Sequence, residues 1–327
     1  MNVVVVGLGS MGKRRIRLLM SYEGIEHVWG VDTQEMRRQE VKEKYNINSY
    51  KSIGEMLEEH SEVDCAFVCT SPLSHHAIIQ ECLKNNLHVF TEINLVNDGY
   101  EESIQLAKER KKVLFLSSTF LYREEIQYIK NIVSEKQRNI NYIYHVGQYL
   151  PDWHPWESYN NFFVGNKRTN GCREIMAIEF PWIVETFGEI KNIHVIHDKM
   201  SRLNIAYDDN YLIEIVHENN NKGILVVDVV CPKAVRQLEI YGEKLYLTWN
   251  GTPTGLKHFD TDKSELRDIL LYKNIMHDVE YQATVIENAY ANEIQEFFSV
   301  VAGQKEQRYG YEKDKEILKW IDKIEGD

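Results

Sequence analysis

The stretch "VVVVGLGSMGKRR", residues 3–15, decides the fold of this chain. Its run of valines is typical of a buried strand, and Gly7, Gly9 and Gly12 follow in GxGxxG spacing directly before a helical segment. The first glycine permits a tight turn, the second lets a pyrophosphate approach the backbone, and the third allows close helix packing. Amides at the start of the helix would face the negative charge. We therefore predict a dinucleotide-binding turn that includes Ser10 and Met11.

A carboxylate at the end of the second strand supports this prediction. The segment "HVWGVD", residues 27–32, ends at Asp32, which follows the glycine turn by about 20 residues. A carboxylate there accepts hydrogen bonds from the adenosine ribose hydroxyls and repels a 2′-phosphate. We predict NAD as the cofactor, with NADP less favoured, although Arg37 and Arg38 add positive charge one turn later.

The pattern of apolar and polar residues changes part-way along the chain. Up to about residue 120, short apolar runs alternate with amphipathic stretches, which indicates a doubly wound parallel sheet of the Rossmann type. From about residue 140, longer alternating strands are joined by polar turns, which indicates an α/β domain with a large, mainly antiparallel open sheet. We predict a nucleotide-binding domain at 1–121 and a substrate or oligomerisation domain at 122–327. The final helix, 310–325, could pack back on the first domain.

Composition and charge narrow the possible functions. A formal net charge of −12 opposes binding to nucleic acid, whose affinity for proteins comes largely from Lys and Arg. No apolar run is long enough to span a membrane, and we expect a cytoplasmic protein without a membrane partner. The odd cysteine count without CxxC spacing predicts reduced, structural thiols, and we expect no metal site. The basic cluster at 13–17 could be a solvated helix face or could attract phosphate.

The third strand ends in "VCTSPLSHH", residues 68–76, where short hydroxyl side chains could line the nicotinamide side of the crevice. The alternative is that Ser71 or Ser74 caps the next helix, and both roles can hold together. The fourth strand, "LHVFTE", ends at Glu92, which we expect to help seat the cofactor. The predicted cofactor contacts around these two strand ends are Thr70, Ser71, Pro72, His76 and Glu92.

These elements in this order resemble the glucose-fructose oxidoreductase, inositol dehydrogenase and MocA family (Gfo/Idh/MocA). The motifs that carry the resemblance are "GLGSMGKRR", "VCTSPLSHH", "LHVFTEINL" and the crossover "LSSTFLYREEIQYIK", which lie mainly within residues 1–130. The resemblance implies a Rossmann domain, a C-terminal open sheet often used for oligomerisation, and NAD- or NADP-dependent oxidation or reduction of sugars, inositols or their derivatives. It also implies a homo-oligomer built through that sheet.

Two departures from the family pattern fall on its chemistry. Ile93 stands where the family has the lysine of its E-K-P motif, and Asn94 stands at the proline. The family's second motif should fall on "REIMAIEFPW", where Ile178 takes the place of its histidine. Hydride transfer at an alcohol needs a group that moves the hydroxyl proton, and isoleucine cannot do so. Glu174 is one candidate replacement.

The helical stretch "CREIMAIEFPWIVETFG", residues 172–188, also carries Arg173 and Glu179 as candidate substrate contacts. A solvated helix face is the alternative for such charges. Pro181 should kink the helix or delay its start, because proline removes a backbone donor and clashes with the preceding turn. Gly188 should cap its C-terminal end.

A second concentration of chemistry lies in the loop "YLPDWHPWESYNNFF", residues 149–163. Trp153 or Trp156 could stack on a sugar ring, and His154 could transfer a proton near neutral pH. The alternative is that the tryptophans only pack and His154 caps a turn. Tyr122, at the crossover between domains, is a weaker substrate contact of the same kind.

The leading functional hypothesis is an NAD-dependent oxidoreductase acting on a sugar or sugar derivative, with His154 or Glu174 as the acid/base group. The alternative is a non-catalytic regulatory protein that binds dinucleotide and sugar, because both usual catalytic positions are lost. A third hypothesis is transient use of bound NAD for elimination, hydrolysis or epimerisation without net redox change.

Overall fold

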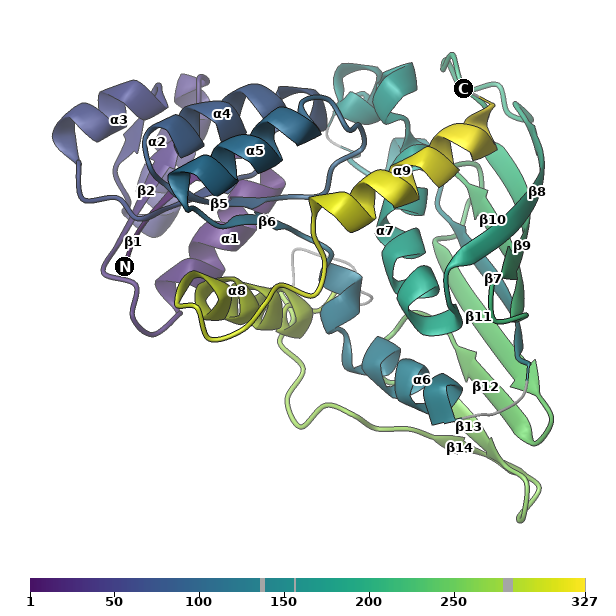
Figure 1. The fold of residues 1–327 in the computed structure, drawn as a ribbon. Helices are drawn as coiled ribbons and strands as arrows, with labels where there is room; N and C mark the ends of the chain where they lie inside the picture. The colour runs from purple at the N-terminus through teal and green to yellow at the C-terminus, as the bar shows by residue number, and fades with distance from the viewer. Residues whose placement is uncertain (136–138, 156, 279–284, 327) are drawn as a thin grey trace. The chain divides into compact units, whose positions relative to one another are not determined.

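A computed structural model of the 327-residue chain describes residues 1–135, 139–155, 157–278 and 285–326 (Figure 1). The chain divides into two compact units. The N-terminal unit consists of residues 1–118 and 291–316, and the C-terminal unit consists of residues 119–290 and 317–327.

The N-terminal unit is built on a six-stranded parallel sheet in the order β3-β2-β1-β4-β5-β6. Its strands are β1 (Asn2–Val6), β2 (His27–Val31), β3 (Ser49–Tyr50), β4 (Cys65–Val68), β5 (His88–Thr91) and β6 (Leu114–Leu116). The strand order reverses between β1 and β4. In open α/β sheets a ligand binds outside the carboxyl ends of the strands at such a reversal.

Helices cover both faces of this sheet, as its buried valines require. In Figure 1, α4 and α5 lie along one face, while α1 and α8 lie along the other. Phe297 of α8 packs edge-on against Phe67, Phe90 and Phe115, with ring centroids 5.2, 5.6 and 5.6 Å away. The helices of this unit are α1 (Ser10–Met20), α2 (Glu35–Tyr45), α3 (Ile53–Glu59), α4 (His75–Lys84), α5 (Tyr100–Arg110) and most of α8 (Asn288–Val301).

The C-terminal unit is built on an eight-stranded sheet in the order β14-β13-β12-β11-β7-β10-β9-β8. Among the described strand pairs of this second sheet, only β7–β10 is parallel. Its strands are β7 (Asn141–Gly147), β8 (Ile190–Asp198), β9 (Asn210–His217), β10 (Lys222–Asp228), β11 (Val235–Gly242), β12 (Leu245–Trp249), β13 (Lys257–Asp260) and β14 (Glu265–Asp268). The predicted fold class, a parallel Rossmann sheet followed by a mainly antiparallel open sheet, is confirmed.

Helix α7 (Gly171–Phe187) packs on this sheet, and α6 (Glu124–Glu135) packs against α7. The prediction of a late helix start near Pro181 is wrong, because α7 begins ten residues earlier, where the Asn170 side chain accepts a bond from the Arg173 amide. The side chains on either side of the proline are fully buried, so packing outweighs the hydrogen bond that proline removes. Gly188 caps the helix, as predicted.

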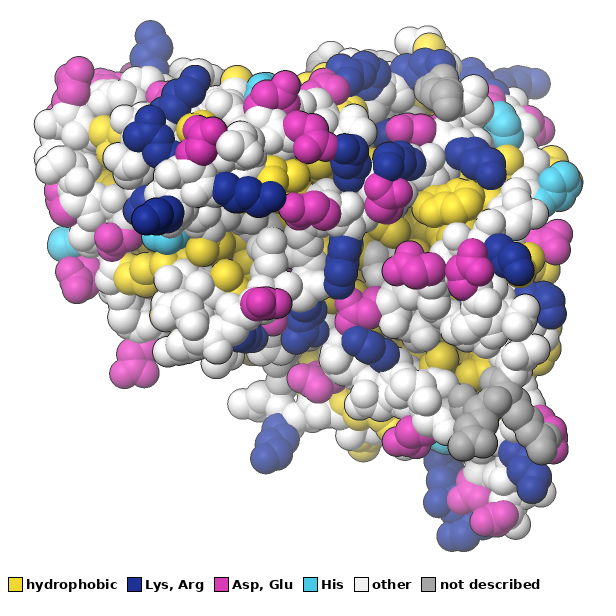
Figure 2. Space-filling model, viewed as in Figure 1, with side chains coloured by type: hydrophobic (Ala, Val, Ile, Leu, Met, Phe, Trp, Pro, Cys, Tyr) yellow, Lys and Arg dark blue, Asp and Glu magenta, His cyan; other side chains and the backbone are white. Residues whose placement is uncertain are grey.

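The final helix, α9 (Tyr311–Glu325), contributes its first residues to the N-terminal unit and the rest to the C-terminal unit. All five cysteines are free thiols, and four of them are buried. Within the described residues, no helix is both long and apolar enough to cross a membrane. On the face shown in Figure 2, Lys and Arg side chains are interspersed with Asp and Glu, so its positive charge does not form a continuous tract.

Candidate functional site

The glycine turn of the N-terminal unit has the geometry that a pyrophosphate requires. Gly7 adopts a φ of +93°, and a Cβ there would lie 2.8 Å from the Cys69 backbone. A Cβ on Gly12 would lie 1.9 Å from the Gly7 carbonyl oxygen, so this position brings α1 against the turn. A Cβ on Gly9 would have the Arg37 guanidinium at 4.0 Å as its nearest neighbour among the described residues. Helix α1 begins at Ser10, and within the described residues no side chain caps it, which leaves its N-terminal end available to an anion.

Asp32 lies beside this turn and is 7% exposed. Its two carboxylate oxygens accept bonds of 2.8 Å from the amides of Leu8 and Gln34, which fix the side chain beside the glycine turn. Arg37 Nη1 lies 3.5 Å from the carboxylate. Each carboxylate oxygen keeps a lone pair for a ribose hydroxyl. Open backbone at Gly9, a helix start without a side-chain cap and a fixed acidic group together fit a dinucleotide.

The end of β4 holds Thr70 tightly between two side chains. Ser74 donates a 2.8 Å hydrogen bond to the Thr70 hydroxyl, and His75 Nε2 lies 3.0 Å from the Thr70 carbonyl. Neither Ser71 nor Ser74 caps the helix that follows with its side chain, so that alternative is not observed. His76 is the predicted cofactor contact, and its Nδ1 lies 3.4 Å from the Ser103 hydroxyl. The neighbouring His75 is the histidine that contacts the end of β4.

The end of β5 carries a buried ion pair that the sequence did not reveal. Arg15 Nε donates a 2.5 Å bond to Glu92, and Arg15 Nη2 donates a 2.7 Å bond to Glu293 of α8. The side chains of Arg15 and Glu293 are fully buried, so the predicted solvated face and the predicted phosphate attraction are both wrong for Arg15. Glu92 is therefore held by Arg15. The expected role of Glu92 in seating the cofactor stays a prediction.

Residues 1–118 match the model of the Gfo/Idh/MocA oxidoreductase family, NAD-binding Rossmann fold. The N-terminal domain belongs to this family. Myo-inositol 2-dehydrogenase of Thermotoga maritima is 28% identical over 136 residues, which are 41% of this chain and 40% of that protein. Biliverdin reductase A of Mus musculus is 29% identical over 138 residues, 42% of this chain and 45% of that protein. The matches thus span less than half the length of these curated relatives.

The fold of the whole chain is also shared with solved members of the same architecture. Levoglucosan dehydrogenase in complex with NADH superposes with a TM-score of 0.80 at 13% identity, covering 100% of this chain and 96% of that one. At this identity the likeness shows the fold. The cofactor prediction is confirmed at the level of the family, because residues 1–118 form an NAD-binding Rossmann domain.

Glu174 has the most unusual environment among the predicted catalytic residues. It lies in the first turn of α7, and its Oε2 is shielded from solvent although the residue as a whole is partly exposed. No group in the described part of the chain offers Oε2 a hydrogen bond. Burial raises the pKa of this carboxyl to about 8. Glu174 therefore keeps its proton near neutral pH and can act as an acid.

The neighbouring charges on α7 are paired with other side chains of the same unit. Arg173 is 6% exposed and pairs with Asp322 at 2.6 Å and with Glu325. Glu179 is fully buried. It accepts bonds from three side chains on two strands and its own helix, at 2.8 Å from Tyr144, 2.6 Å from Trp182 and 2.6 Å from Arg236. Neither side chain lies on a solvated face, and a contact of Arg173 or Glu179 with substrate stays a prediction.

The loop at 149–163 packs against the start of the same helix. Trp153 donates a 3.1 Å bond to the Gln148 carbonyl, and its ring would lie 3.5 Å from a Cβ on Gly171. The His154 ring lies 4.2 Å from that of Phe162, and burial lowers the pKa of His154 while Glu157 opposes this change. Trp156 lies outside the described residues.

Tyr122 is the remaining predicted contact, and the partners of two buried charges could not be predicted from the sequence. Tyr122 is 6% exposed, in the short helical turn Thr119–Tyr122. The partners of Arg15 and Glu179, namely Glu293 and Arg236, come from segments far along the chain, and no local pattern links them. Within the described residues, no group of three His, Cys, Asp or Glu side chains could hold a metal ion.

Proposed function

We propose that this protein is an NAD-dependent oxidoreductase that transfers a hydride at a secondary alcohol or carbonyl of a sugar or sugar derivative. The observation that carries this proposal is the glycine turn beside Asp32 in a domain of an NAD-binding oxidoreductase family. Relatives named myo-inositol 2-dehydrogenase and levoglucosan dehydrogenase support a polyol or sugar as substrate. Bound NAD would supply the hydride acceptor or donor, and the N-terminal unit would hold it.

We assign NAD rather than NADP from the position of Asp32. Its carboxylate is nearly buried and fixed by two amides, so it cannot turn away from a 2′-phosphate. Arg37 contacts this carboxylate and offsets part of the repulsion. Calorimetric titration with NAD and with NADP tests the assignment, and tighter binding of NADP would contradict it.

Glu174 is the residue that we assign to proton transfer. Ile93 and Ile178 have no titratable group, so the proton of the alcohol must move through another side chain. Glu174 has a free carboxyl oxygen and holds a proton at neutral pH, which suits donation to a developing alkoxide. His154 is the second candidate, because its lowered pKa leaves a neutral imidazole that can accept a proton.

The experiment that tests the function is a screen of polyols, uronates, amino sugars and nucleotide sugars for NADH formation or consumption. A substrate found in this way should lose most of its turnover in Glu174→Gln, because general acid/base groups contribute about 10²- to 10⁴-fold. Silence across the screen, together with tight NAD binding and no deuterium exchange into bound NAD, would refute the proposal.

A second candidate is a non-catalytic regulatory protein that binds dinucleotide and sugar. The observation that favours it is the apolar pair Ile93 and Ile178, with charges nearby that are already paired within the fold. Any substrate-dependent hydride exchange would eliminate it. Product formation without net NADH would instead favour elimination, hydrolysis or epimerisation.

The outer face of the eight-stranded sheet is the surface that we assign to homo-oligomer formation. Ile143 lies beside Ile224 on neighbouring strands, and Ile196 lies beside Leu212. These four side chains are 42, 48, 64 and 42% exposed, while alternate residues on the same strands pack on the other face. Light scattering should show an oligomer that Ile224→Glu dissociates. A monomeric wild-type protein would contradict this assignment.

A further inference from the structure

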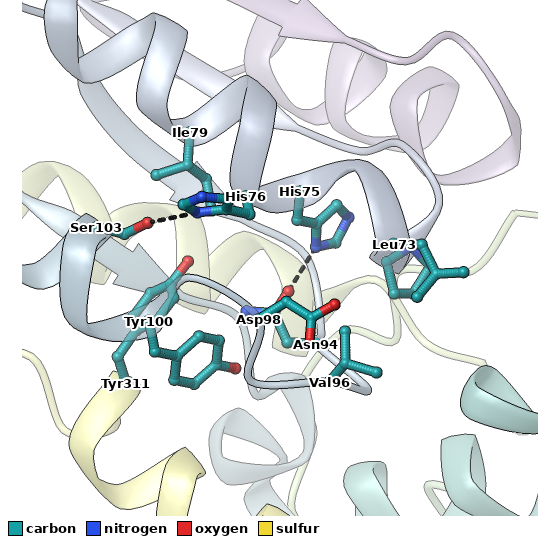
Figure 3. Close-up of a pocket in the computed structure, with 11 residues that line it drawn as sticks. Leu73, His75, His76, Ile79, Asn94, Val96, Asp98, Tyr100, Ser103 and Tyr311 are labelled. Atoms are coloured by element: carbon teal, nitrogen blue, oxygen red, sulfur yellow. Dashed lines mark hydrogen bonds between the residues drawn. The ribbon is translucent and has the colours of Figure 1, made fainter.

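A small cavity with both polar and apolar walls lies in the N-terminal unit between the loop that follows β5 and the helices α4, α5 and α9 (Figure 3). It has room for about one water molecule. His75, Asn94, Tyr100 and Tyr311 face it, together with apolar side chains that include Leu73. Asn94 belongs to the Glu-Ile-Asn stretch at residues 92–94, which departs from the family pattern. The function proposed above assigns it no role.

Asn94 is buried, and its amide is only half satisfied. The side chain is 2% exposed, and its Oδ1 lies 2.6 Å from His75 Nδ1. On the other side, Nδ2 lies toward the hydroxyls of Tyr100 and Tyr311, but it meets no group in the described residues with hydrogen-bond geometry. A buried amide donor without a partner costs about 1–3 kcal/mol.

His75 has a related difficulty, because both of its ring nitrogens face acceptors. Nδ1 lies 2.6 Å from the Asn94 carbonyl oxygen, and Nε2 lies 3.0 Å from the Thr70 carbonyl oxygen. A neutral imidazole has one N–H and can donate to only one of them. The ring is 2% exposed, and burial lowers the pKa of His75, so the neutral form is favoured at neutral pH.

A half-turn of the Asn94 amide resolves both difficulties. Nδ2 then donates to the bare Nδ1 of His75, while His75 Nε2–H donates to the Thr70 carbonyl. The Asn94 carbonyl oxygen turns toward the cavity and needs a donor. Tyr100 already donates to Asp314 at 2.5 Å, and Tyr311 already donates to Thr91 at 2.9 Å. A water molecule in the cavity can supply this donor.

We propose that His75 and Asn94 form a neutral hydrogen-bonded dyad, completed by one bound water, that positions the nicotinamide edge of the site. The dyad joins the loops that follow β4 and β5, which are adjacent parallel strands. It fixes the Thr70 carbonyl on one side and the residue next to Ile93 on the other. His75 is thus a positioning residue, and this role rests on the dinucleotide function proposed above.

The test reads the protonation of His75 directly and does not depend on turnover. In protein labelled with ¹⁵N-histidine, the ring signals that disappear in His75→Gln belong to this residue. We expect a neutral ring with its proton on Nε2 at pH 7, with and without NAD. A doubly protonated ring, or a neutral ring with its proton on Nδ1, would overturn the dyad.

Asn94→Asp gives a matched chemical control. A carboxylate cannot donate to Nδ1, so the ring should take up a second proton in this variant at pH 7. Leu73→Ala, which changes an apolar wall of the same cavity, should leave the ring as it is in the wild type. An unchanged neutral ring in Asn94→Asp would show that His75 does not bond to Asn94.

Kinetics separate positioning from a merely structural role. With a substrate from the screen, His75→Gln and Asn94→Ala should each lower kcat by roughly 10- to 100-fold. KM and NAD affinity should be retained, and the double variant should lose no more than one single variant. Additive losses, or equal losses of NAD affinity, would count against the dyad. A wild-type protein without turnover would count against the proposed function, and the NMR result would still decide the dyad.

Discussion

Replacing Glu174 by glutamine should make this protein's stability less sensitive to pH, because the native carboxyl is buried without a partner at Oε2. Burial raises its pKa from 4.5 to about 8. As the pH rises between these values, the unfolded chain loses the proton before the folded chain does. Folding stability therefore falls through this window and levels off above pH 8.

The size of the effect follows from the width of the window. Each pH unit between the two pKa values changes the free energy of unfolding by about 1.4 kcal/mol. From pH 5 to pH 7, the wild-type protein should lose about 3 kcal/mol relative to Glu174→Gln, which has no proton to lose. The variant should be the more stable of the two at pH 7.

Urea unfolding followed by tryptophan fluorescence at pH 5, 6, 7 and 8 measures this difference. Glu218→Gln, which changes an exposed carboxyl of the same unit, is the matched control and should give a constant difference from the wild type. A difference for Glu174→Gln that stays constant within about 0.5 kcal/mol over the series would refute the reasoning. When the reaction is assayed as carbonyl reduction, wild-type kcat/KM should fall as the pH rises above 8, where the acid form of Glu174 is lost.

Three further outcomes are expected. Asp32→Ser should weaken NAD binding about tenfold and reduce the difference between NAD and NADP affinity, as measured by calorimetry. A larger difference in affinity would contradict the contact of Asp32 with the ribose. Arg15→Leu should destabilise the protein by about 3–5 kcal/mol, because it leaves the carboxylates of Glu92 and Glu293 buried without their cation. The control Lys13→Leu breaks an exposed ion pair and should cost at most about 1 kcal/mol in the same denaturation series. Gly12→Ala should abolish NAD binding in equilibrium dialysis, since its Cβ would lie 1.9 Å from the Gly7 carbonyl oxygen; retained affinity would show that α1 can shift.

Patterns that act over a few residues were predictable from the sequence. Alternation of apolar and polar residues located the main strands, and the spacing of Gly7, Gly9 and Gly12 located the nucleotide turn. The short strands β3, β13 and β14 were not predicted. They contain two to four residues, and all of these residues are at least partly exposed, so no apolar run marks them. Local patterning succeeds where burial repeats along the chain.

The prediction that Pro181 delays the start of the helix was wrong for a reason of the same kind. A proline disfavours a helix locally, but the helix around it is held by a cap at Asn170 and by fully buried side chains on both sides. Intrinsic preference is a weak term beside the burial of a whole helix face. The sequence shows the local cost of a proline inside a helix, but it does not show the packing that opposes this cost.

What the sequence determined by itself was the cofactor turn and the fold class, whereas the replacement of the family's proton carriers by Ile93 and Ile178 stays a prediction. Only the tertiary structure decided what the charged and polar residues do. It joined Arg15 to Glu92 and Glu293, closed Glu179 into a buried network, left Glu174 with a free oxygen, and placed Asn94 against His75. The physical reason is that a charge takes its role from its partners and its solvent exposure, and both are set by residues distant in the sequence.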